Sequence, residues 1–543
     1  MVSVAAATVD IDRQNQPSLS RLGTDALIVP ALKTCHYPKL CTKLTLEFRH
    51  PAKGLTKLLN FTNIHQEAPP AWAEKHFGEV DLGDPRRNQR AVTIATAMAI
   101  NPDKSIPQIF LNSYDVKAAY SFFRHPEATP DDLQEAHREV VIEQTHKPGR
   151  YLFLEDTSEM TWSGHQPIEG LGPIGSGASG LQGFHLHSVL AVRWQCEVAE
   201  AKSWPTRPAV EVLGLPVQHY HVRKPRPKGE PANNSKLIKQ RARESQWWLE
   251  AGQALGPAPA DKQIEWSRIC DRGADIYEHL VSCQELDHRF VVRAAQDRCL
   301  TDEEGRKITG KLFATARAQP ALGGFDLELR ARPGQDARTA KLQISSVEVW
   351  LRAPQRPGRG PGYLPPVRCN VVRVWEADPG PGTEALEWIL LTDWPANAYA
   401  QALEVALAYS TRWLIEEFHK ALKTGTKAEK LQMEAAEALF ASIAIKSVVA
   451  LRLLDLRERV RLDPEAEASQ SGLSKLELAV LRERLNRPVK TVREVALAIG
   501  RLGGHMNRKG DGLPGWQTLF RGMAKLNDLV EGVRIAQKLK SFG

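Results

Sequence analysis

Two features that stabilise or anchor many proteins are scarce in this sequence: paired cysteines and long apolar runs. The seven cysteines show no C-x-x-C spacing, which argues against a structural zinc site and indicates reduced thiols in a cytosol. No apolar run approaches the ~20 residues that span a membrane. The N-terminus lacks the basic start and apolar block of a signal peptide. We therefore expect a soluble, cytoplasmic protein.

Charge of one sign is in modest excess only. Lys and Arg number 72 against 64 Asp and Glu, a net charge of +8, which permits a polyanionic partner without requiring one. The surplus is uneven, because residues 223–243 hold eight cations and one acid, and the last 43 residues hold eight cations and three acids. Its distribution is therefore more informative than its sum.

The 543 residues allow two to four domains, and changes of pattern divide them. We expect a poorly ordered extension of unknown role, a small helical domain, an α/β core in two parts around a β-strand insertion, and a helical C-terminal domain. The expected boundaries are 1–68 for the extension, 69–145 for the helical domain, 146–296 and 385–450 for the core, 297–384 for the insertion and 451–543 for the last domain.

The helical domain carries a basic edge. The segment LGDP at 82–85 predicts a turn in which Asp84 caps the next helix and the proline takes its first position. Arg86, Arg87 and Arg90 then fall in the opening turns of that helix, where backbone N–H groups also favour phosphate. A helical cap with an incidental arginine cluster is the alternative interpretation.

Two aspartates stand at predicted strand ends in the core. An apolar strand at 151–154 leads to Asp156, and a later strand–helix–strand segment carries Asp271 at the end of its first strand. Functional groups collect at such ends, although an aspartate there is more often a turn or cap residue. His185 and His187, two apart on one strand face, fit either a metal pair or ordinary strand histidines, and the latter are commoner.

The stretch YSTRWLIEEFHKALK at 409–423 predicts a helix, because it lacks Pro and Gly and is rich in helix formers. At roughly 100° per residue, its opposite face is apolar and can dock on a core. A solvated surface is the ordinary interpretation of the polar face, but a tyrosine among charges and a cation excess around one acid suit a site for a metal and phosphates. That polar face collects Tyr409, Arg412, Glu416, Lys420 and Lys423.

Asp156, Asp271 and Glu416 together supply what two-metal phosphoryl transfer needs. Carboxylates from separate elements hold two divalent cations in such sites, and magnesium prefers these hard oxygen ligands. Spacing alone does not select these three from 64 acids.

From about Trp72 to the C-terminus, the sequence resembles the DDE transposases of the insertion-sequence-four family, in particular the branch of the bacterial transposon Tn-five. The Y-x2-R-x3-E-x6-K signature of that family is met by Tyr409, Arg412, Glu416 and Lys423. Further segments match in the same order along the chain: LGDPRR at 82–87, LEDT at 154–157, HSVL at 187–190, CDR-AD at 270–275 and RLGG at 501–504.

This resemblance implies a ribonuclease-H-like α/β core with the β-strand insertion, an N-terminal helical DNA-binding domain and a C-terminal helical dimerisation domain. It implies that Asp156, Asp271 and Glu416 are the catalytic ligands of two Mg²⁺ ions, for which Mn²⁺ can substitute. It also implies three sets of contacts to double-stranded DNA: phosphates near the cut, the transposon end, and a flipped base stacked on tryptophan. The residues are, respectively, Tyr409, Arg412, Lys420 and Lys423; Arg86, Arg87 and Arg90; and Trp388.

The implied activity is cut-and-paste transposition by a homodimer on paired inverted-repeat ends, through a DNA hairpin, with joining of the 3′-hydroxyl ends to target DNA. One alternative is a non-catalytic, dimerising DNA-binding repressor of transposition, in which three acids at one site would have no physical use. A second is a simple nuclease on the same core. The complete Tyr–Arg–Glu–Lys face and the C-terminal helices argue against that nuclease.

Overall fold

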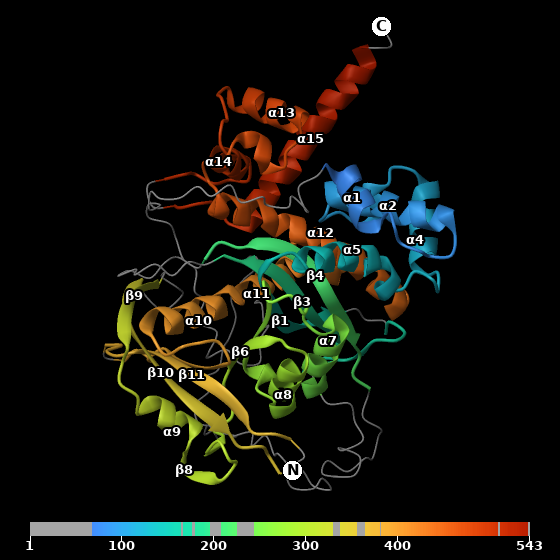
Figure 1. The fold of residues 1–543 in the computed structure, drawn as a ribbon. Helices are drawn as coiled ribbons and strands as arrows, with labels where there is room; N and C mark the ends of the chain where they lie inside the picture. The colour runs from blue at the N-terminus through green and yellow to red at the C-terminus, as the bar shows by residue number, and fades with distance from the viewer. Residues whose placement is uncertain are drawn as a thin grey trace, which may run out of the picture. The chain divides into compact units, whose positions relative to one another are not determined.

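The computed structural model describes residues 68–163, 167–175, 180–195, 208–224, 244–329, 337–355, 364–380, 382–508 and 511–540 (Figure 1). The expected extension 1–68, apart from Ala68, and most of the basic segment 223–243 lie outside these residues.

The first described region is helical, as its pattern predicts. Asp84 accepts a hydrogen bond from the backbone N–H of Arg86 at 2.8 Å and so caps the second helix, which begins at Pro85. Gly83 before it has φ +73°, a left-handed conformation that glycine adopts without strain. The predicted turn and cap are thus present. The helices are α1 Pro69–Phe77, α2 Pro85–Ile100, α3 Ile106–Ile109, α4 Ser113–Phe123 and α5 Pro130–Thr145.

A mixed sheet of twelve strands follows, in the order β2-β3-β1-β5-β6-β12-β11-β10-β7-β8, with β4 beside β3 and β9 beside β10. The strands are β1 Gly149–Trp162, β2 Gly172–Pro173, β3 Gln182–Trp194, β4 Glu211–His221, β5 Ile264–Cys270, β6 Arg289–Arg293, β7 Cys299–Thr301, β8 Lys307–Lys311, β9 Gly323–Leu329, β10 Arg338–Leu351, β11 Val367–Glu376 and β12 Glu387–Thr392.

The centre of this sheet is parallel. β1 pairs with β5, and β5 pairs with β6, in parallel register, while β3 pairs antiparallel with β1 and β4 pairs antiparallel with β3. The helices α7 Trp247–Leu255 and α8 Tyr277–Glu285 belong to this part, and α8 is the crossover between β5 and β6. β1 and β5 therefore end at the same edge of the sheet, here called the carboxyl end.

The segment expected to be a separate strand insertion continues the same sheet, because β11 pairs with β12 and β12 pairs with β6. It also contains one short helix, α9 Leu312–Arg317, where only strands were expected. Leu312 and Ala316, one helical turn apart, are both buried. Apolar residues at this i, i+4 spacing favour a helix that packs on a core.

The helix expected at 409–423 is broken into α10 Tyr399–Thr411 and α11 Trp413–Lys420, followed by a π-helical turn at Ala421–Gly425. The hydroxyls of Ser410 and Thr411 both donate to the carbonyl of Leu407, at 2.7 and 3.1 Å. Such back-bonding competes with the helical hydrogen bonds and bends helices. The predicted apolar side is nevertheless fully buried, and it includes Leu414, Ile415 and Phe418.

The C-terminal part is helical. α12 Ala436–Leu462 packs against α5 and β4, and it is followed by α13 Lys475–Leu485, α14 Val492–Leu502 and α15 Trp516–Lys540. Gly503 caps α14 and Gly504 has φ +97°, so the predicted helix stop is confirmed. Within the described ranges, no helix combines the length and apolarity needed to cross a membrane.

Candidate active site

Two carboxylates meet where the parallel pairing of β1 with β5 ends. Glu155 is opposite Cys270 in the parallel register, so Asp156 and Asp271 come one position later on neighbouring strands. The Oδ1 atom of Asp271 accepts a hydrogen bond from the N–H of Gly273 at 2.8 Å, which caps a short 3₁₀ turn. The expectation that Asp156 stands at a strand end is wrong, because β1 continues to Trp162 and Asp156 pairs with Ser188 of β3, whereas Asp271 does follow the last residue of β5. Both aspartates nevertheless lie at the edge where the parallel pairing ends, and the loop after β5 gives access to a substrate there.

The third carboxylate comes from α11. Arg412, at the junction of α10 and α11, donates to Glu416 one turn later, and its Nη1 lies 3.6 Å from Oδ2 of Asp156. The side chain of Arg412 is 11 % exposed, against 19 % for Asp156 and 22 % for Glu416. Arg412, which is largely shielded from solvent, therefore connects Glu416 of α11 with Asp156 of β1.

The balance of charge at this acid cluster (Asp156, Asp271 and Glu416) is negative. Burial raises the pKa of Asp156 to about 8; Arg412 opposes this shift, and the charges of Asp271 and Glu416 reinforce it. Burial alone would lower the pKa of Arg412, but Tyr409 and the neighbouring carboxylates raise it well above its ordinary value. One guanidinium does not neutralise three carboxylates, so the cluster favours additional cations.

On the opposite face of β1, a hydrogen-bonded chain supports Asp156. The N–H of Thr157 donates to Asp156 Oδ1 at 2.9 Å, and the Thr157 hydroxyl is 2.8 Å from Nδ1 of His187. Nε2 of His187 lies 3.7 Å from Glu155, whose carboxylate is paired with Arg268, and both members of that pair are fully buried. Burial alone would raise the pKa of Glu155, but Arg268 holds it well below its usual range.

Comparison with known families gives two matches, one at each end of the described chain. Residues 69–128 match the transposase DNA-binding family, and residues 448–543 match the transposase Tn5 dimerisation domain. The two matched regions are those of Tn5-like transposases. This confirms the family expected from the sequence motifs.

The match divides this transposase into a helical DNA-binding region, a mixed α/β part with the large sheet, and a helical dimerisation domain. The acid cluster lies in the middle part, outside both matched regions. The DNA-binding match covers α1 to α4, and the dimerisation match begins within α12.

The three arginines of the basic edge have different surroundings. Arg86 is exposed. Arg87 donates to the carbonyl of Leu82 and its Nη2 is 2.8 Å from Nε2 of His125. Arg90 forms an ion pair with Asp115 at 2.9 Å. Arg87 and Arg90 are thus held in fixed directions, while Arg86 points to solvent, and all three fall in the DNA-binding region.

The remaining signature residues lie on α11 or next to it in the chain. Tyr409 is 8 % exposed, and the guanidinium carbon of Arg412 lies 5.8 Å from the centre of its ring. Lys420 is exposed. Lys423 follows in the π-helical turn, where it donates to the carbonyl of Glu159 and lies 3.7 Å from Glu429. The extra residue of that turn rotates Lys423 away from the regular helical position used to group it with Lys420.

Trp388 is a buried residue of β12. It is 5 % exposed, pairs with Val374 on β11, and its ring centre is 6.4 Å from that of Tyr409 with an interplanar angle of 52°. The ring therefore stands beside the Tyr–Arg–Glu–Lys face. Its role in stacking on a flipped base stays a prediction.

Sequence reasoning missed several residues that the fold brings together. The Glu155–Arg268 pair joins residues 113 apart in the chain, which no local pattern predicts. His219 and His221 lie opposite His187 and His185 on the neighbouring strand, beside α7. The alternation of histidine in QHYH at 218–221 was a usable signal for the second pair.

Proposed function

We propose that this chain is a cut-and-paste DNA transposase, which binds transposon ends, cleaves them by metal-dependent phosphoryl transfer and joins the freed 3′-hydroxyl ends to target DNA. The observation that carries this proposal is the acid cluster: three carboxylates from β1, the end of β5 and α11 surround one guanidinium at the carboxyl end of the sheet. We take this central part of the sheet to be a ribonuclease-H-like core that the strands β7 to β11 extend.

The donor set fits hard divalent cations. Carboxylate oxygens are the ligands that Mg²⁺ prefers. Burial, reinforced by the charges of Asp271 and Glu416, raises the pKa of Asp156, and a bound cation would oppose that shift. Asp156, Asp271 and Glu416 would hold two Mg²⁺ ions, with Mn²⁺ as a substitute. Bound there, they would activate the attacking oxygen and stabilise the leaving oxygen.

The cations and the tyrosine around α11 would hold the DNA backbone at the cut. Arg412 and Lys423 are partly shielded from solvent and held by hydrogen bonds, so each can direct a phosphate with little loss of side-chain freedom. Lys420 is exposed and would add a longer-range contact, and Tyr409 would contribute its hydroxyl. Arg86, Arg87 and Arg90 would contact the transposon end.

The proposed reaction has four displacements at phosphorus. Water cleaves one strand at the transposon end and frees a 3′-hydroxyl, which attacks the opposite strand to give a hairpin. A second water reopens the hairpin, and the 3′-hydroxyl finally attacks target DNA. Bending the strand into a hairpin crowds its bases, and Trp388 would receive one extruded base, since stacking returns about 1–3 kcal/mol.

Paired ends require two chains, and the dimerisation domain would join them as a homodimer. Near the end of α15, Ile535 and Leu539 are 50 % and 67 % exposed and lie one turn apart. Exposed apolar residues at this spacing are typical of a helix that packs against a partner.

The test is the substitution Glu416→Gln. We expect the variant to bind transposon-end DNA normally and to lose cleavage, because a metal ligand is lost while the phosphate contacts remain. Glu417→Gln on the same helix is the matched control, since Glu417 pairs with Arg457, whereas Glu416 pairs with Arg412 of the acid cluster. Cleavage by Glu416→Gln at more than a few per cent of the wild-type rate in magnesium would contradict the assigned role.

Metal dependence separates the proposal from the repressor alternative. EDTA should abolish cleavage by the wild type, and manganese should restore it. A repressor would bind ends equally well with and without metal and would cleave under neither condition, so an inert but well-folded wild type would favour it.

A further inference from the structure

Four histidines lie on two adjoining strands, on the face of the sheet opposite to Asp156. His185 and His187 of β3 are directly across from His221 and His219 of β4, whereas Asp156 is across from Ser188. Because side chains alternate along a strand, all four imidazoles project from one face. Helix α7 packs against β4, with Trp247 and Trp248 against these histidines.

Three ligand atoms converge within this group. One ring nitrogen each from His219 and His221 and a carboxylate oxygen of Glu250 on α7 lie within 4.8 Å of one another. Nε2 of His221 is 3.9 Å from Oε2 of Glu250, which is too long for a hydrogen bond. Zinc binds histidine nitrogen at about 2.0–2.1 Å and carboxylate oxygen at about 2.0–2.2 Å, so a small inward shift would allow both atoms to ligate one ion.

The imidazoles of this group have unused nitrogen atoms. Nδ1 of His219 and Nε2 of His221 are buried without a hydrogen-bond partner. A buried polar atom that lacks a partner is costly. A metal ion bound by these nitrogen atoms and the neighbouring carboxylate would accept their lone pairs and remove that cost.

The ligand directions are fixed by packing. The His221 ring stacks on Trp247, with ring centres 4.5 Å apart and an interplanar angle of 11°, so it cannot rotate without losing that contact. Glu250 is also on α7, one turn after Trp247, and its side chain is 47 % exposed, which leaves a path for an ion from solvent.

We propose that His219, His221 and Glu250 bind one borderline divalent metal ion, of which Zn²⁺ is the chemical type, separately from the hard cations of the acid cluster. Two imidazoles and one carboxylate favour zinc over magnesium and leave a fourth position open. The ion would tie β4 to α7. The ion pair between Arg223 and Glu244, with Nε and Oε1 at 2.8 Å, joins the same two parts of the chain, so the metal would reinforce an existing connection.

Zinc titration of the full-length chain tests this site. The protein is stripped of metal with EDTA, dialysed into excess MgCl₂, which occupies the acid cluster, and titrated with ZnCl₂ in a calorimeter. We expect one zinc ion per chain. Glu250→Gln should weaken binding by at least about tenfold, since losing even an outer-sphere partner costs 10- to 100-fold. Glu285→Gln, an exposed glutamate on α8, is the matched control and should bind as the wild type does.

Cobalt spectroscopy locates the ion independently. Co²⁺ bound by two imidazoles in a tetrahedral site should give visible absorption bands that persist in Glu416→Gln and disappear in the double variant His219→Gln/His221→Gln. Because Glu250 is half exposed, Glu250→Gln should fold normally, and its metal-free thermal unfolding confirms this. Failure of the wild type to take up zinc in excess magnesium would overturn the proposal. So would equal zinc binding by the wild type and both ligand variants, or loss of the bands in Glu416→Gln.

Discussion

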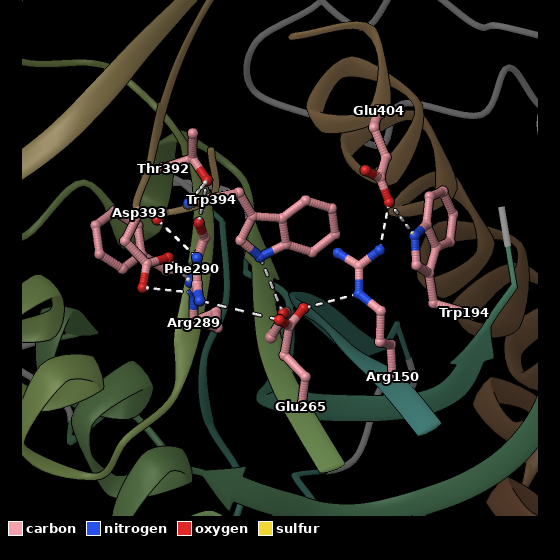
Figure 2. Close-up of polar contacts among 10 residues, drawn as sticks. Arg150, Trp194, Glu265, Arg289, Phe290, Thr392, Asp393, Trp394 and Glu404 are labelled. Carbon is pink, nitrogen blue, oxygen red and sulfur yellow. Dashed lines mark hydrogen bonds and ion pairs between the residues drawn. The ribbon is translucent and has the colours of Figure 1, made fainter. Parts of the chain in front are cut away.

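The two ends of the central sheet use charged residues differently. At the amino end, Arg150 donates to Glu265 at 2.9 Å and also to Glu404, while Arg289 lies 3.0 Å from Asp393 (Figure 2). Neutral donors add to these pairs: the Trp194 indole bonds to Glu404 at 3.0 Å, and the N–H of Phe290 bonds to Asp393 at 2.8 Å. Glu404 and Asp393 each have two donors directed at them, and Glu265 has its hydrogen bond from Arg150, with Arg289 farther away at 3.9 Å.

At the carboxyl end, three carboxylates share Arg412. Asp156 has the guanidinium at 3.6 Å, beyond hydrogen-bond distance, and one backbone N–H at 2.9 Å. Both ends contain acids and arginines at partly buried positions, so charge alone does not mark a site. The difference is that the amino end satisfies its acids internally, whereas the carboxyl end leaves negative charge for cations from outside.

Strand β12 reaches both ends and carries a tryptophan near each. Trp394, just after β12, is 2 % exposed; its indole donates to Ser267 at 3.1 Å, and Arg150 lies over its ring at 4.4 Å (Figure 2). Trp388 is similarly buried but stands beside Tyr409. Burial therefore does not distinguish the two residues, and their different neighbours do.

The largest effect is expected from neutralising one acid at each end. Asp156→Asn should reduce end cleavage by at least about a hundredfold, since loss of one preorganised electrostatic group typically costs 10²–10³ in rate. Its thermal stability should not fall, because one of three mutually repelling carboxylates is removed. Glu265→Gln should cleave at the wild-type rate but unfold at a lower temperature. Gel assays give the cleavage rates of both variants, and thermal unfolding gives their stabilities. Slow cleavage by Glu265→Gln together with a lower unfolding temperature of Asp156→Asn would refute the difference between the two ends of the sheet.

The second prediction compares the two tryptophans. Trp388→Ala should nick the first strand at near-normal rate and then accumulate nicked DNA before the hairpin, because the base-stacking surface is lost. Trp394→Ala should lower stability by about 3–5 kcal/mol, the usual cost of a buried aromatic ring, and slow every step alike. Gel separation of nicked, hairpin and fully cut ends shows which occurs. Uniform slowing in Trp388→Ala would assign that residue to the core.

A third, smaller effect concerns the amino-end network. Arg150→Met should lower the free energy of unfolding by about 1–3 kcal/mol, because Glu265 and Glu404 lose a shared charged donor. Arg150→Lys keeps the charge but not the two-pronged geometry, so it should fall between the wild type and Arg150→Met. Urea unfolding of the three proteins gives the order. Stabilities that agree within error would mean that this network is no tighter than an ordinary surface pair.

Much of the fold and part of the site could be predicted from local sequence. The Asp84 cap and the buried side of α11 follow from patterns a few residues long. The break at Arg412 could not be predicted, because Ser410 and Thr411 can bond either to solvent or to the helix, and the surroundings decide. The pairing of β12 with β6, which places Leu390 opposite Arg293, joins segments that are distant in the chain, and periodicity does not specify it.

The three acids illustrate the same limit. Strand ends indicated Asp156 and Asp271 as candidates, and helical periodicity put Glu416 on a polar face, but only family resemblance grouped them. The structure adds the link through Arg412. The Glu155–Arg268 pair and the convergence of Glu250 on two histidines depend on contacts between elements, so they became visible only in the folded chain.

A fourth effect, confined to acidic pH, should appear as a pH dependence at the amino end. His288 precedes β6 and is 2 % exposed, with Nε2 2.9 Å from the carbonyl of Gly256. Burial lowers its pKa from 6.5 to about 4, and Arg268 adds to the shift. Between these values the unfolded chain binds a proton that the folded chain does not, so the histidine favours unfolding as the pH falls from 6.5 to 4.

His288→Gln keeps a donor for Gly256 but cannot be protonated. Its free energy of unfolding should therefore fall less than that of the wild type between pH 7 and pH 4, by up to on the order of 3 kcal/mol. His146→Gln, at an exposed histidine, should follow the wild-type curve. Urea titrations at several pH values measure the slopes. Parallel curves for the wild type and His288→Gln would show that His288 accepts its proton in the folded state without loss of stability.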